Sequence, residues 1–348
     1  MWSTNFHILY VSFFAAAFAH PSCPLPGSPT FSSSRTCSFP PHPYIVAPSF
    51  GKNLGMFTRH TLEPGSIIMR ETPVLVIGPS RFPRAAYPMA EVKELVRAEY
   101  DKLSQSGKDQ VASLTFHVQE WEEKPQTLTD KLGYIFRTNA YETDSSVGLF
   151  PRIARINHSC RPNAAYYWST ELNKRIVYAT RTIAEGEEIF VSYIPLLLTR
   201  EERQQRLNRY GFTCTCSACS QSTHNLSTSD QRRKEIKHAF LAFEPQLKLD
   251  IPQTTSSFRK ATKNAASSLE LKDLVEKEEL ADYYAKVYRI VAISHARIRD
   301  WEKASVWANM GYERKVMEDS KSIWTLEMYE LTRRFIENWE GDLKNRTG

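Results

Sequence analysis

Four cysteines in the folded part of the chain have a spacing that suits a bound metal ion. Cys214, Cys216 and Cys219 form a CxCxxC cluster, and Cys160 is the only other cysteine between residues 44 and 348. A closed structural zinc site uses four ligands, and thiolates are among the preferred ones. The pattern therefore predicts a four-thiolate zinc site that joins Cys160 to the downstream cluster. Two alternatives remain open: reduced surface thiols, or a disulfide within the CxCxxC cluster with the other thiols free.

Cys160 belongs to the nine-residue stretch RINHSCRPN, which also holds the polar side chains of Asn157 and His158. Tying residue 160 to residues 214–219 closes a loop over the strand that ends at Ser192 and Tyr193. A pocket is expected at that junction, with Asn157 and His158 beside it.

The elements that position these residues fall into two kinds of sequence. Short β-rich runs separated by turns fill residues 44–77 and return as three further strands at residues 163–168, 175–180 and 188–194. Between them, charged and Leu-containing segments with helical spacing predict a helical insertion at about residues 89–140.

The chain after residue 194 reads as helical. Residues 199–210 form a polar helix that Thr199 caps and that leads into the cysteine cluster. A Ser/Thr/Asn-rich linker is expected at residues 221–230. The remainder has paired helices with a break near Arg299 and Asp300, as in helical-hairpin repeats.

The N-terminus has the features of a targeting segment. An apolar run at residues 6–18 and the A-x-A pattern at residues 17–19 predict a signal peptide at residues 1–19, although the positive n-region is missing. A disordered leader or a wrong start codon are the alternatives. Residues 20–43 are rich in Pro and Ser and predict an extended linker. Its two cysteines, Cys23 and Cys37, would pair only in a secreted protein.

Composition excludes several classes of protein. Hydrophobic residues make up 41% of the 348 residues, as in an ordinary globular protein, and no stretch after the leader is apolar enough for a transmembrane helix. The net charge of +6 is not concentrated in one block, so direct binding to nucleic acid is not expected.

Three motifs taken together resemble one family, the SET-domain lysine methyltransferases. They are NHSCRPN (residues 157–163), GEEIFVSY (186–193) and YGFTCTC (210–216), in that order. The upstream GKNLGMF (51–57) resembles the family's cofactor loop, with Asn53 in place of a glycine. The CxCxxC cluster and the C-terminal helices resemble the SMYD subgroup and its fungal relatives, but the cysteines of the MYND zinc module are absent from the sequence.

The resemblance implies an α+β fold whose β core is a SET domain at residues 44–194, with the helical insertion at about 89–140. It implies a threaded (pseudoknot) loop near residues 157–163 and a post-SET zinc segment at residues 195–220. An all-α, TPR-like C-terminal domain would occupy residues 231–348.

The resemblance also implies methyl transfer from S-adenosyl-L-methionine to a lysine side chain of a protein, histone or non-histone. Aromatic side chains would form the catalytic pocket: Tyr141, Tyr193 and Tyr210. The cofactor would be held by Lys52, Asn53, Leu54, Gly55, Asn139, Asn157, His158 and Phe212. The alternative is a catalytically silent SET-derived module that binds a partner protein through its C-terminal helices. The expected protein is a monomer. The leader favours the secretory pathway, whereas the family favours nucleus or cytoplasm.

Overall fold

The computed structural model describes residues 42–79 and 88–347, and residues 43–348 form one compact unit. The predicted signal peptide, nearly all of the predicted N-terminal linker and its cysteines Cys23 and Cys37 lie outside the described residues. Among the helices of the described part, none combines the length and the apolar character that a bilayer span requires.

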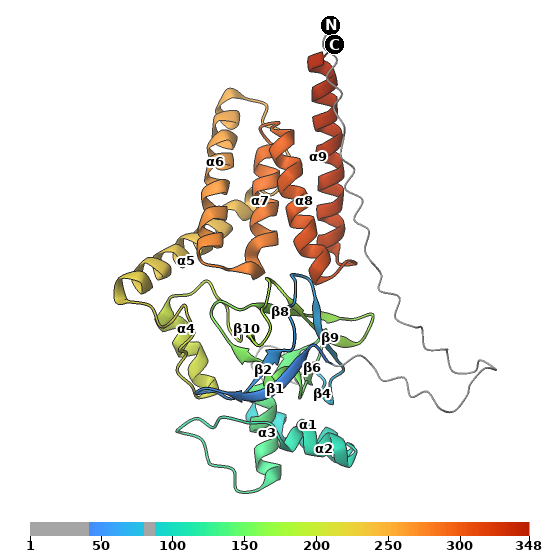
Figure 1. Cartoon of the computed structure of the whole chain (residues 1–348), viewed down its shortest axis with the longest axis vertical. Coiled ribbons are helices and arrows are strands. Elements are labelled where there is room, and N and C mark those ends of the chain that lie inside the picture. The colour runs from blue at the N-terminus through green and yellow to red at the C-terminus, as the bar shows by residue number, and fades with distance from the viewer. Residues whose placement is uncertain (1–41, 80–87, 348) are drawn as a thin grey trace, which may run out of the picture. The chain divides into compact units, whose positions relative to one another are not determined.

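The described strands form three small sheets, drawn in Figure 1. The first has the order β1-β2-β10-β7, in which β7 runs parallel to β10 and the other neighbours are antiparallel. The second and third are antiparallel, with the orders β3-β9-β8 and β4-β6-β5. The strands are β1 (Tyr44–Ser49), β2 (Asn53–Thr58), β3 (Ile67–Glu71), β4 (Leu75–Ile77), β5 (Ala140–Glu142), β6 (Val147–Leu149), β7 (Asn157–His158), β8 (Ala164–Ser169), β9 (Lys174–Ala179) and β10 (Glu188–Val191).

The β7–β10 pair brings together two motifs from separate parts of the chain. Asn157 lies opposite Phe190, and His158 lies opposite Val191. The strand predicted at residues 188–194 ends earlier, at Val191, because the Ser192 hydroxyl donates a hydrogen bond to the Ile194 carbonyl and turns the chain.

The segment predicted as a helical insertion contains three helices: α1 (Met89–Asp101), α2 (Gln105–Ala112) and α3 (Leu128–Asn139). Thr127 and Asp130 form a capping box at the start of α3, which satisfies backbone N–H groups that would otherwise lack partners. Helix α3 runs directly into β5, so the insertion delivers Tyr141 to the third sheet. A short 3₁₀ helix, η1 (Ile153–Arg155), precedes β7.

The polar helix expected at residues 199–210 is divided in two. Helix α4 (Arg200–Leu207) starts with a capping box between Thr199 and Glu202, and η2 (Asn208–Tyr210) continues it as a 3₁₀ turn. Gly211 then has φ +78°, a backbone conformation that favours glycine. This turn reverses the chain just before Phe212 and the cysteine cluster.

The linker predicted at residues 221–230 is wrong, because helix α5 spans Thr223–Phe243. The Ser222 side chain caps the helix by accepting a hydrogen bond from the Asn225 N–H. Ser229 inside it donates to the buried Glu278 carboxylate at 2.7 Å. Tertiary contacts of this kind override the low helix propensity of Ser, Thr and Asn.

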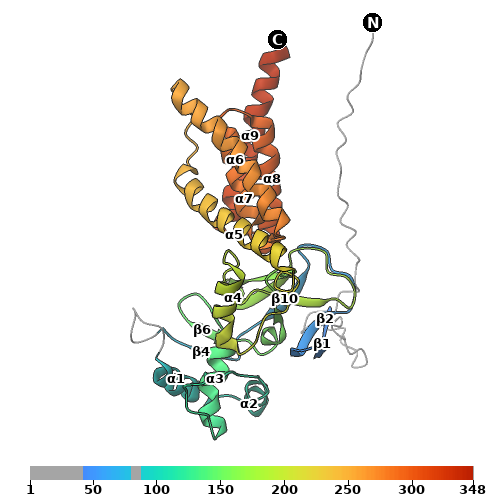
Figure 2. The same cartoon turned by 90° about the vertical axis from the view of Figure 1, so that its left-hand side faces the viewer.

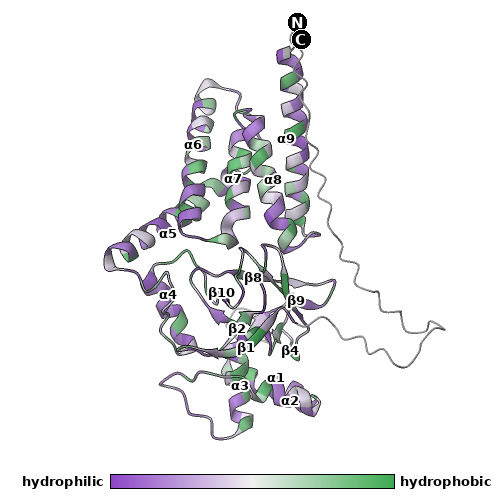
Figure 3. Ribbon diagram, in the orientation of Figure 1, coloured by the Kyte–Doolittle hydropathy of each residue, from purple (hydrophilic) through white to green (hydrophobic). Residues whose placement is uncertain are grey.

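The C-terminal helices lie side by side in Figures 1 and 2, and Figure 3 shows hydrophobic residues along α7 and α8. Both faces of α7 are buried, from Val287 to Ala296 with one exception, Arg289. The helices after α5 are η3 (Glu244–Gln246), α6 (Thr255–Lys277), η4 (Ala281–Tyr283), α7 (Tyr284–Ala296), α8 (Trp301–Glu318) and α9 (Ile323–Thr347).

One hydrophobic core joins these helices to the candidate metal-binding residues. Cys160 and Leu207 pack in the same cluster as Ile236 of α5 and Val287 of α7, and all four are completely buried. The helices therefore form the back wall of the cysteine region.

Candidate active site

The turn between β1 and β2 carries the predicted cofactor loop. Gly51 has φ +71° and Asn53 has φ +63°, so Asn53 adopts the left-handed conformation expected of a residue in a glycine's place. The Lys52 side chain is committed elsewhere, since its ammonium lies 3.2 Å from a Glu188 carboxylate oxygen and 4.4 Å from the centre of the Phe190 ring. The charge of Lys52 is therefore paired with a carboxylate within the site.

Position 55 requires a glycine, because three side chains approach its backbone closely. A Cβ atom at this position would lie 2.4 Å from Glu188 Oε1, 2.9 Å from Ser49 Cβ and 3.1 Å from Asn157 Nδ2. The first of these distances is shorter than any contact a side chain tolerates. The loop and the NHSC motif are thus packed directly against each other.

Asn157 and Glu188 hold this packing together. The Asn157 amide donates to the Leu54 carbonyl at 2.9 Å and to Glu188 Oε1 at 2.7 Å, while the Ser49 hydroxyl donates to Glu188 Oε2 at 2.9 Å. Glu188 was not among the predicted site residues, although it lies inside the GEEIFVSY motif. Its carboxylate accepts hydrogen bonds from the β1–β2 turn and from Asn157 and so holds the two together.

His158 lies between the cavity and the cysteines. Its Nδ1 accepts a hydrogen bond from the Tyr193 N–H at 3.1 Å, so the ring proton is assigned to Nε2, which lies 3.3 Å from Cys160 Sγ. Burial lowers the pKa of His158 to about 4. The ring is therefore neutral at pH 7 and links Tyr193 to the cysteine cluster.

The four predicted cysteine ligands meet. The sulfurs of Cys160, Cys214, Cys216 and Cys219 all lie within 4.8 Å of one another, and the thiols are free of disulfides. Cys219 Sγ is 3.7 Å from Cys160 Sγ, well beyond the length of a disulfide bond. The open alternative of a disulfide within the CxCxxC cluster is excluded in this structure.

Two buried arginines surround the cysteine cluster, and neither was predicted from the sequence. Arg203 of α4 places Nη2 3.9 Å from Cys219 Sγ, and its Nη1 donates to the Leu198 carbonyl. Arg233 of α5 donates to the carbonyls of Cys160 and Leu196. A fully buried cation next to sulfur is favourable when the sulfur carries negative charge.

Tyr193 and Tyr210 form one pair of aromatic walls. Their ring centres are 5.1 Å apart, and the Tyr193 hydroxyl donates a 2.6 Å hydrogen bond to the Ile156 carbonyl. The Tyr210 hydroxyl accepts from Arg209 Nη2 at 2.5 Å. Burial raises the pKa of Tyr193, so its hydroxyl stays protonated at neutral pH.

Tyr141 faces a second tyrosine. Its ring centre lies 5.1 Å from that of Tyr166 on β8, a residue that sequence reasoning missed although it lies in a predicted strand. Burial raises the pKa of Tyr141 well above its ordinary value. These tyrosines provide an apolar wall with neutral hydroxyl groups.

A cavity of about 1020 Å³ runs past these residues. All predicted cofactor and catalytic residues except Gly55 line it, together with Cys214 and Cys216. Asn139 is there as well, but its amide nitrogen is committed to the carbonyls of Thr115 and Ile135 at 2.7 and 2.8 Å. Gly55 lies behind the wall, against Glu188.

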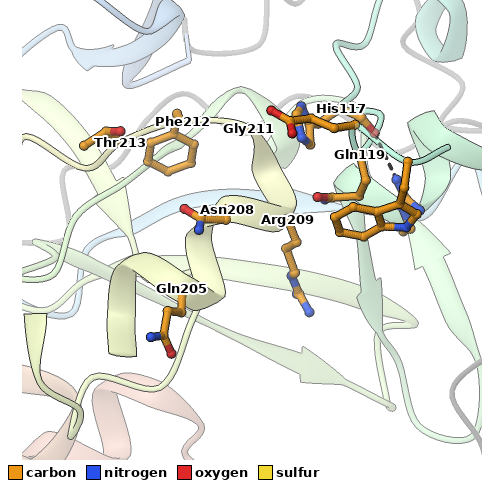
Figure 4. A pocket seen from close by; sticks show the side chains of 11 residues that line it. His117, Gln119, Gln205, Asn208, Arg209, Gly211, Phe212 and Thr213 are labelled. Carbon is orange, nitrogen blue, oxygen red and sulfur yellow. Dashed lines mark hydrogen bonds between the residues drawn. The ribbon is translucent and has the colours of Figure 1, made fainter. Parts of the chain in front are cut away.

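A second cavity of about 850 Å³ adjoins the first at Gly211, Phe212 and Thr213. Figure 4 shows Phe212 and Thr213 on one side of it and His117 and Gln119 on the other. Phe212 is 36% exposed and lines both cavities. Its ring centre is 6.2 Å from that of His158 and 6.5 Å from that of Tyr193.

Comparison with known proteins finds a family match for part of the chain. Residues 53–194 match the SET domain family. The chain is similar to the histone-lysine N-methyltransferase set5 of Schizosaccharomyces pombe, with 32% identity over 198 residues that cover 56% of each chain. It is also similar to the N-lysine methyltransferase SMYD2 of Gallus gallus, with 28% identity over 199 residues, 56% of this chain and 38% of that protein.

The chain thus spans about half or less of the length of the curated relatives it matches. Among solved structures, that of Rubisco LSMT bound to AdoMet aligns with 88% of this chain and 95% of that chain, at 13% sequence identity and a TM-score of 0.33.

Proposed function

Residues 53–194 of this chain are a SET domain, and on this premise we propose that the protein transfers a methyl group from S-adenosyl-L-methionine to the side-chain amine of a protein lysine. The observation that carries the proposal is Tyr193, which lines the 1020 Å³ cavity and whose hydroxyl donates a 2.6 Å hydrogen bond to the Ile156 carbonyl. Phe212 lines the same cavity.

The reaction needs a neutral lysine amine, whose pKa in water is about 10.4. Apolar surroundings disfavour the charged form of an amine, and the rings of Tyr141, Tyr193 and Tyr210 supply such surroundings. S-adenosyl-L-methionine, when bound, supplies an electrophilic methyl group. Positioning and desolvation then provide the rate, and no carboxylate base is required.

Tyr193 is well placed to orient the amine. Because its proton is donated to the Ile156 carbonyl, the hydroxyl oxygen keeps its lone pairs for an N–H of the amine. The amine would then direct its own lone pair away from Tyr193. This is a positioning role and not that of a general base. Burial raises the pKa of Tyr193, so the phenolate form that could accept a proton is hardly populated at neutral pH.

The cofactor is proposed to lie between the β1–β2 turn and Phe212. Lys52, Asn53 and Leu54 line the cavity and would face its charged amino-acid end. Asn157 and His158 line the middle of the cavity, and the exposed Phe212 ring offers a stacking face for adenine. Gly55 would act by keeping Asn157 in place, and Asn139 through its side-chain oxygen.

We further propose that the cysteine cluster binds zinc. Zinc–sulfur bonds of about 2.3 Å give a tetrahedron whose sulfurs are about 3.8 Å apart, and the Cys160 and Cys219 sulfurs are 3.7 Å apart. Four thiolates around Zn²⁺ would carry a net negative charge, which the buried Arg203 guanidinium, 3.9 Å from Cys219 Sγ, would compensate in part. The ion would fix the turn that carries Tyr210 and Phe212.

The decisive experiment is mass spectrometry of proteins methylated by the purified full chain in the presence of S-adenosyl-L-methionine. The zinc-replete protein is expected to methylate lysine, and Tyr193→Phe to lose most of this activity. Binding of the cofactor without methylation of any protein would favour the alternative of a silent binding module. Absence of cofactor binding would overturn the proposal outright.

A further inference from the structure

The cavity wall contains a buried arginine to which neither the cofactor loop nor the proposed methyl transfer gives a role. Arg175, on β9, is 5% exposed and lines the 1020 Å³ cavity with Tyr141, Tyr166 and Tyr193. Its guanidinium carbon lies 4.8 Å from the ring centre of Tyr141 and 4.9 Å from that of Tyr166. Phe150 closes a third side at 5.4 Å. Three aromatic rings thus surround the charge.

Within the described residues, no carboxylate lies within ion-pair distance of this guanidinium. Its Nη2 donates to the Glu142 carbonyl, and its Nε is buried without a hydrogen-bond partner. Glu71, the cross-strand neighbour of Arg175 on β3, uses its two carboxylate oxygens for the N–H groups of Arg152 and Ile153. Within the described residues, therefore, no ion pair neutralises the positive charge, and Glu142 acts on it only from beyond ion-pair distance.

The hydrogen bond from Arg175 to the Glu142 carbonyl connects β9 to β5. This connection does not explain why the residue at position 175 carries a positive charge. A neutral amide could donate the same hydrogen bond at a smaller desolvation cost, because burying an unpaired charge is far more expensive than burying a polar group. The cation–π contacts recover part of that cost. A cation retained under these conditions is expected to act on something inside the cavity.

Two charges of the same sign at close range in a partly desolvated site disfavour one another. We propose that the Arg175 guanidinium disfavours the ammonium form of the substrate lysine in this cavity and so keeps the amine nucleophilic. This inference rests on the proposed methyltransferase function. It assigns to Arg175 an electrostatic role next to the desolvating role of the tyrosines.

Other titratable groups face the same region and set the background for a pH measurement. Tyr141 and Tyr166 remain protonated, because burial raises the pKa of both. Glu142 and Asp282 are the nearby acidic groups, on β5 and η4, and Glu71 lies across the sheet. Tyr193 and Tyr210 complete the wall. None of these side chains forms an ion pair with Arg175 in the described structure.

The test uses sinefungin, a cofactor analogue that carries a primary amine in place of the transferred methyl group, so no protein substrate is needed. Calorimetry in buffers of different ionisation enthalpy gives the number of protons released on binding at pH 7.5. The neutral S-adenosyl-L-homocysteine serves as the reference ligand. The wild-type chain is expected to bind sinefungin as the free amine, with release of close to one proton and an affinity that rises with pH.

In Arg175→Gln, proton release is expected to fall and the affinity for sinefungin relative to S-adenosyl-L-homocysteine at pH 7.5 to rise about tenfold. Arg175→Lys keeps the charge and should keep the wild-type behaviour. Arg333→Met removes an exposed cation that is paired with Glu330 and Glu337 on α9, and should change nothing.

The outcomes separate this inference from the proposed function. An Arg175→Gln protein that binds S-adenosyl-L-homocysteine normally and still releases the proton overturns the role of Arg175, even if the chain methylates lysine. A wild-type protein that releases no proton overturns it too, whether or not the variants fold. The expected shift in a chain that methylates no protein would instead refute the methyltransferase function alone.

Discussion

His158 Nε2 lies 3.3 Å from Cys160 Sγ, while Nδ1 on the other side of the ring accepts the Tyr193 N–H. One imidazole therefore connects the cysteine cluster to the strand end that carries the central tyrosine. A disturbance of the cysteines should reach the cavity through this ring.

Cys160→Ser is expected to lose both the metal and cofactor affinity. A serine oxygen is a poor substitute for the fourth thiolate, and the loop that holds Asn157 and His158 would lose its anchor. Metal content by atomic absorption and the dissociation constant of S-adenosyl-L-homocysteine measure the two effects. Cys37→Ser, which replaces a cysteine that is not one of the four proposed ligands, is the control. Full cofactor affinity in metal-free protein would refute the link between the sites.

Tyr193→Phe should reduce kcat about 100-fold and leave the affinity for S-adenosyl-L-homocysteine within about twofold. The substitution removes only the hydroxyl that is proposed to orient the amine and keeps the aromatic ring. Tyr167→Phe, on the neighbouring sheet and packed against Tyr178, is the control and should retain activity. A parallel loss of cofactor affinity in Tyr193→Phe would assign the hydroxyl to the architecture of the loop.

Gly55→Ala should destabilise the protein by about 1–3 kcal/mol, because the added methyl group would overlap Glu188 Oε1. Displacement of Glu188 would also release Asn157 and Lys52, so cofactor affinity should fall. Urea unfolding and calorimetric titration measure these quantities. Gly341→Ala on α9, where an added Cβ meets nothing within 4 Å, should be neutral or slightly stabilising. Equal behaviour of the two variants would contradict the close packing.

Arg233→Met should cost about 3–5 kcal/mol of unfolding free energy, since it leaves Glu278 and the Cys160 carbonyl buried with fewer partners. Arg233 and Glu278 are both completely buried, with Nε 3.0 Å from Oε2. The exposed pair of Arg333 and Glu330 provides the comparison, and Arg333→Ala should cost less than about 1 kcal/mol. Chemical denaturation of both variants gives the difference.

The stability of the C-terminal helices should fall as the pH drops from about 7 to about 5. Burial lowers the pKa of His295, whose Nδ1 lies 3.0 Å from Asp300 Oδ2. The unfolded chain therefore takes up a proton more readily than the folded one, and the folded state loses stability below the ordinary histidine pKa of about 6.5. His295→Asn keeps a donor near Asp300 without a titrating ring, so its unfolding free energy should change less between pH 7.5 and 5.5. An unchanged pH dependence would assign the effect to other groups.

The local motifs were sufficient to indicate which residues meet in the site. The NHSCRPN and CxCxxC motifs contain the four cysteines whose sulfurs the fold brings within 4.8 Å of one another. This grouping was predictable because a structural zinc site needs four ligands and the folded part of the sequence has four cysteines. The helical insertion, the Thr199 cap and the break near Arg299 follow equally from short-range patterns of periodicity and capping.

Long-range contacts were beyond that reasoning. The helix at Thr223–Phe243 forms in a segment with linker composition because Ser229 and Arg233 reach Glu278, 49 and 45 residues away. In the same way, the contacts of the Lys52 ammonium with Glu188 and the Phe190 ring join residues that are more than 130 positions apart.

The sequence by itself thus determined the cysteine set, three of the four tyrosines that line the cavity and the order of the motifs, since these depend on residue type and spacing along the chain. Only the tertiary structure decided which charges face the cavity. Arg175 lies on a strand whose sequence gives no sign of a functional residue. In the structure, aromatic rings from β5, β8 and the turn after β6 surround its guanidinium. No carboxylate of the described residues forms an ion pair with it. The electrostatics of a buried site depend on distances in space, and a linear sequence does not contain them.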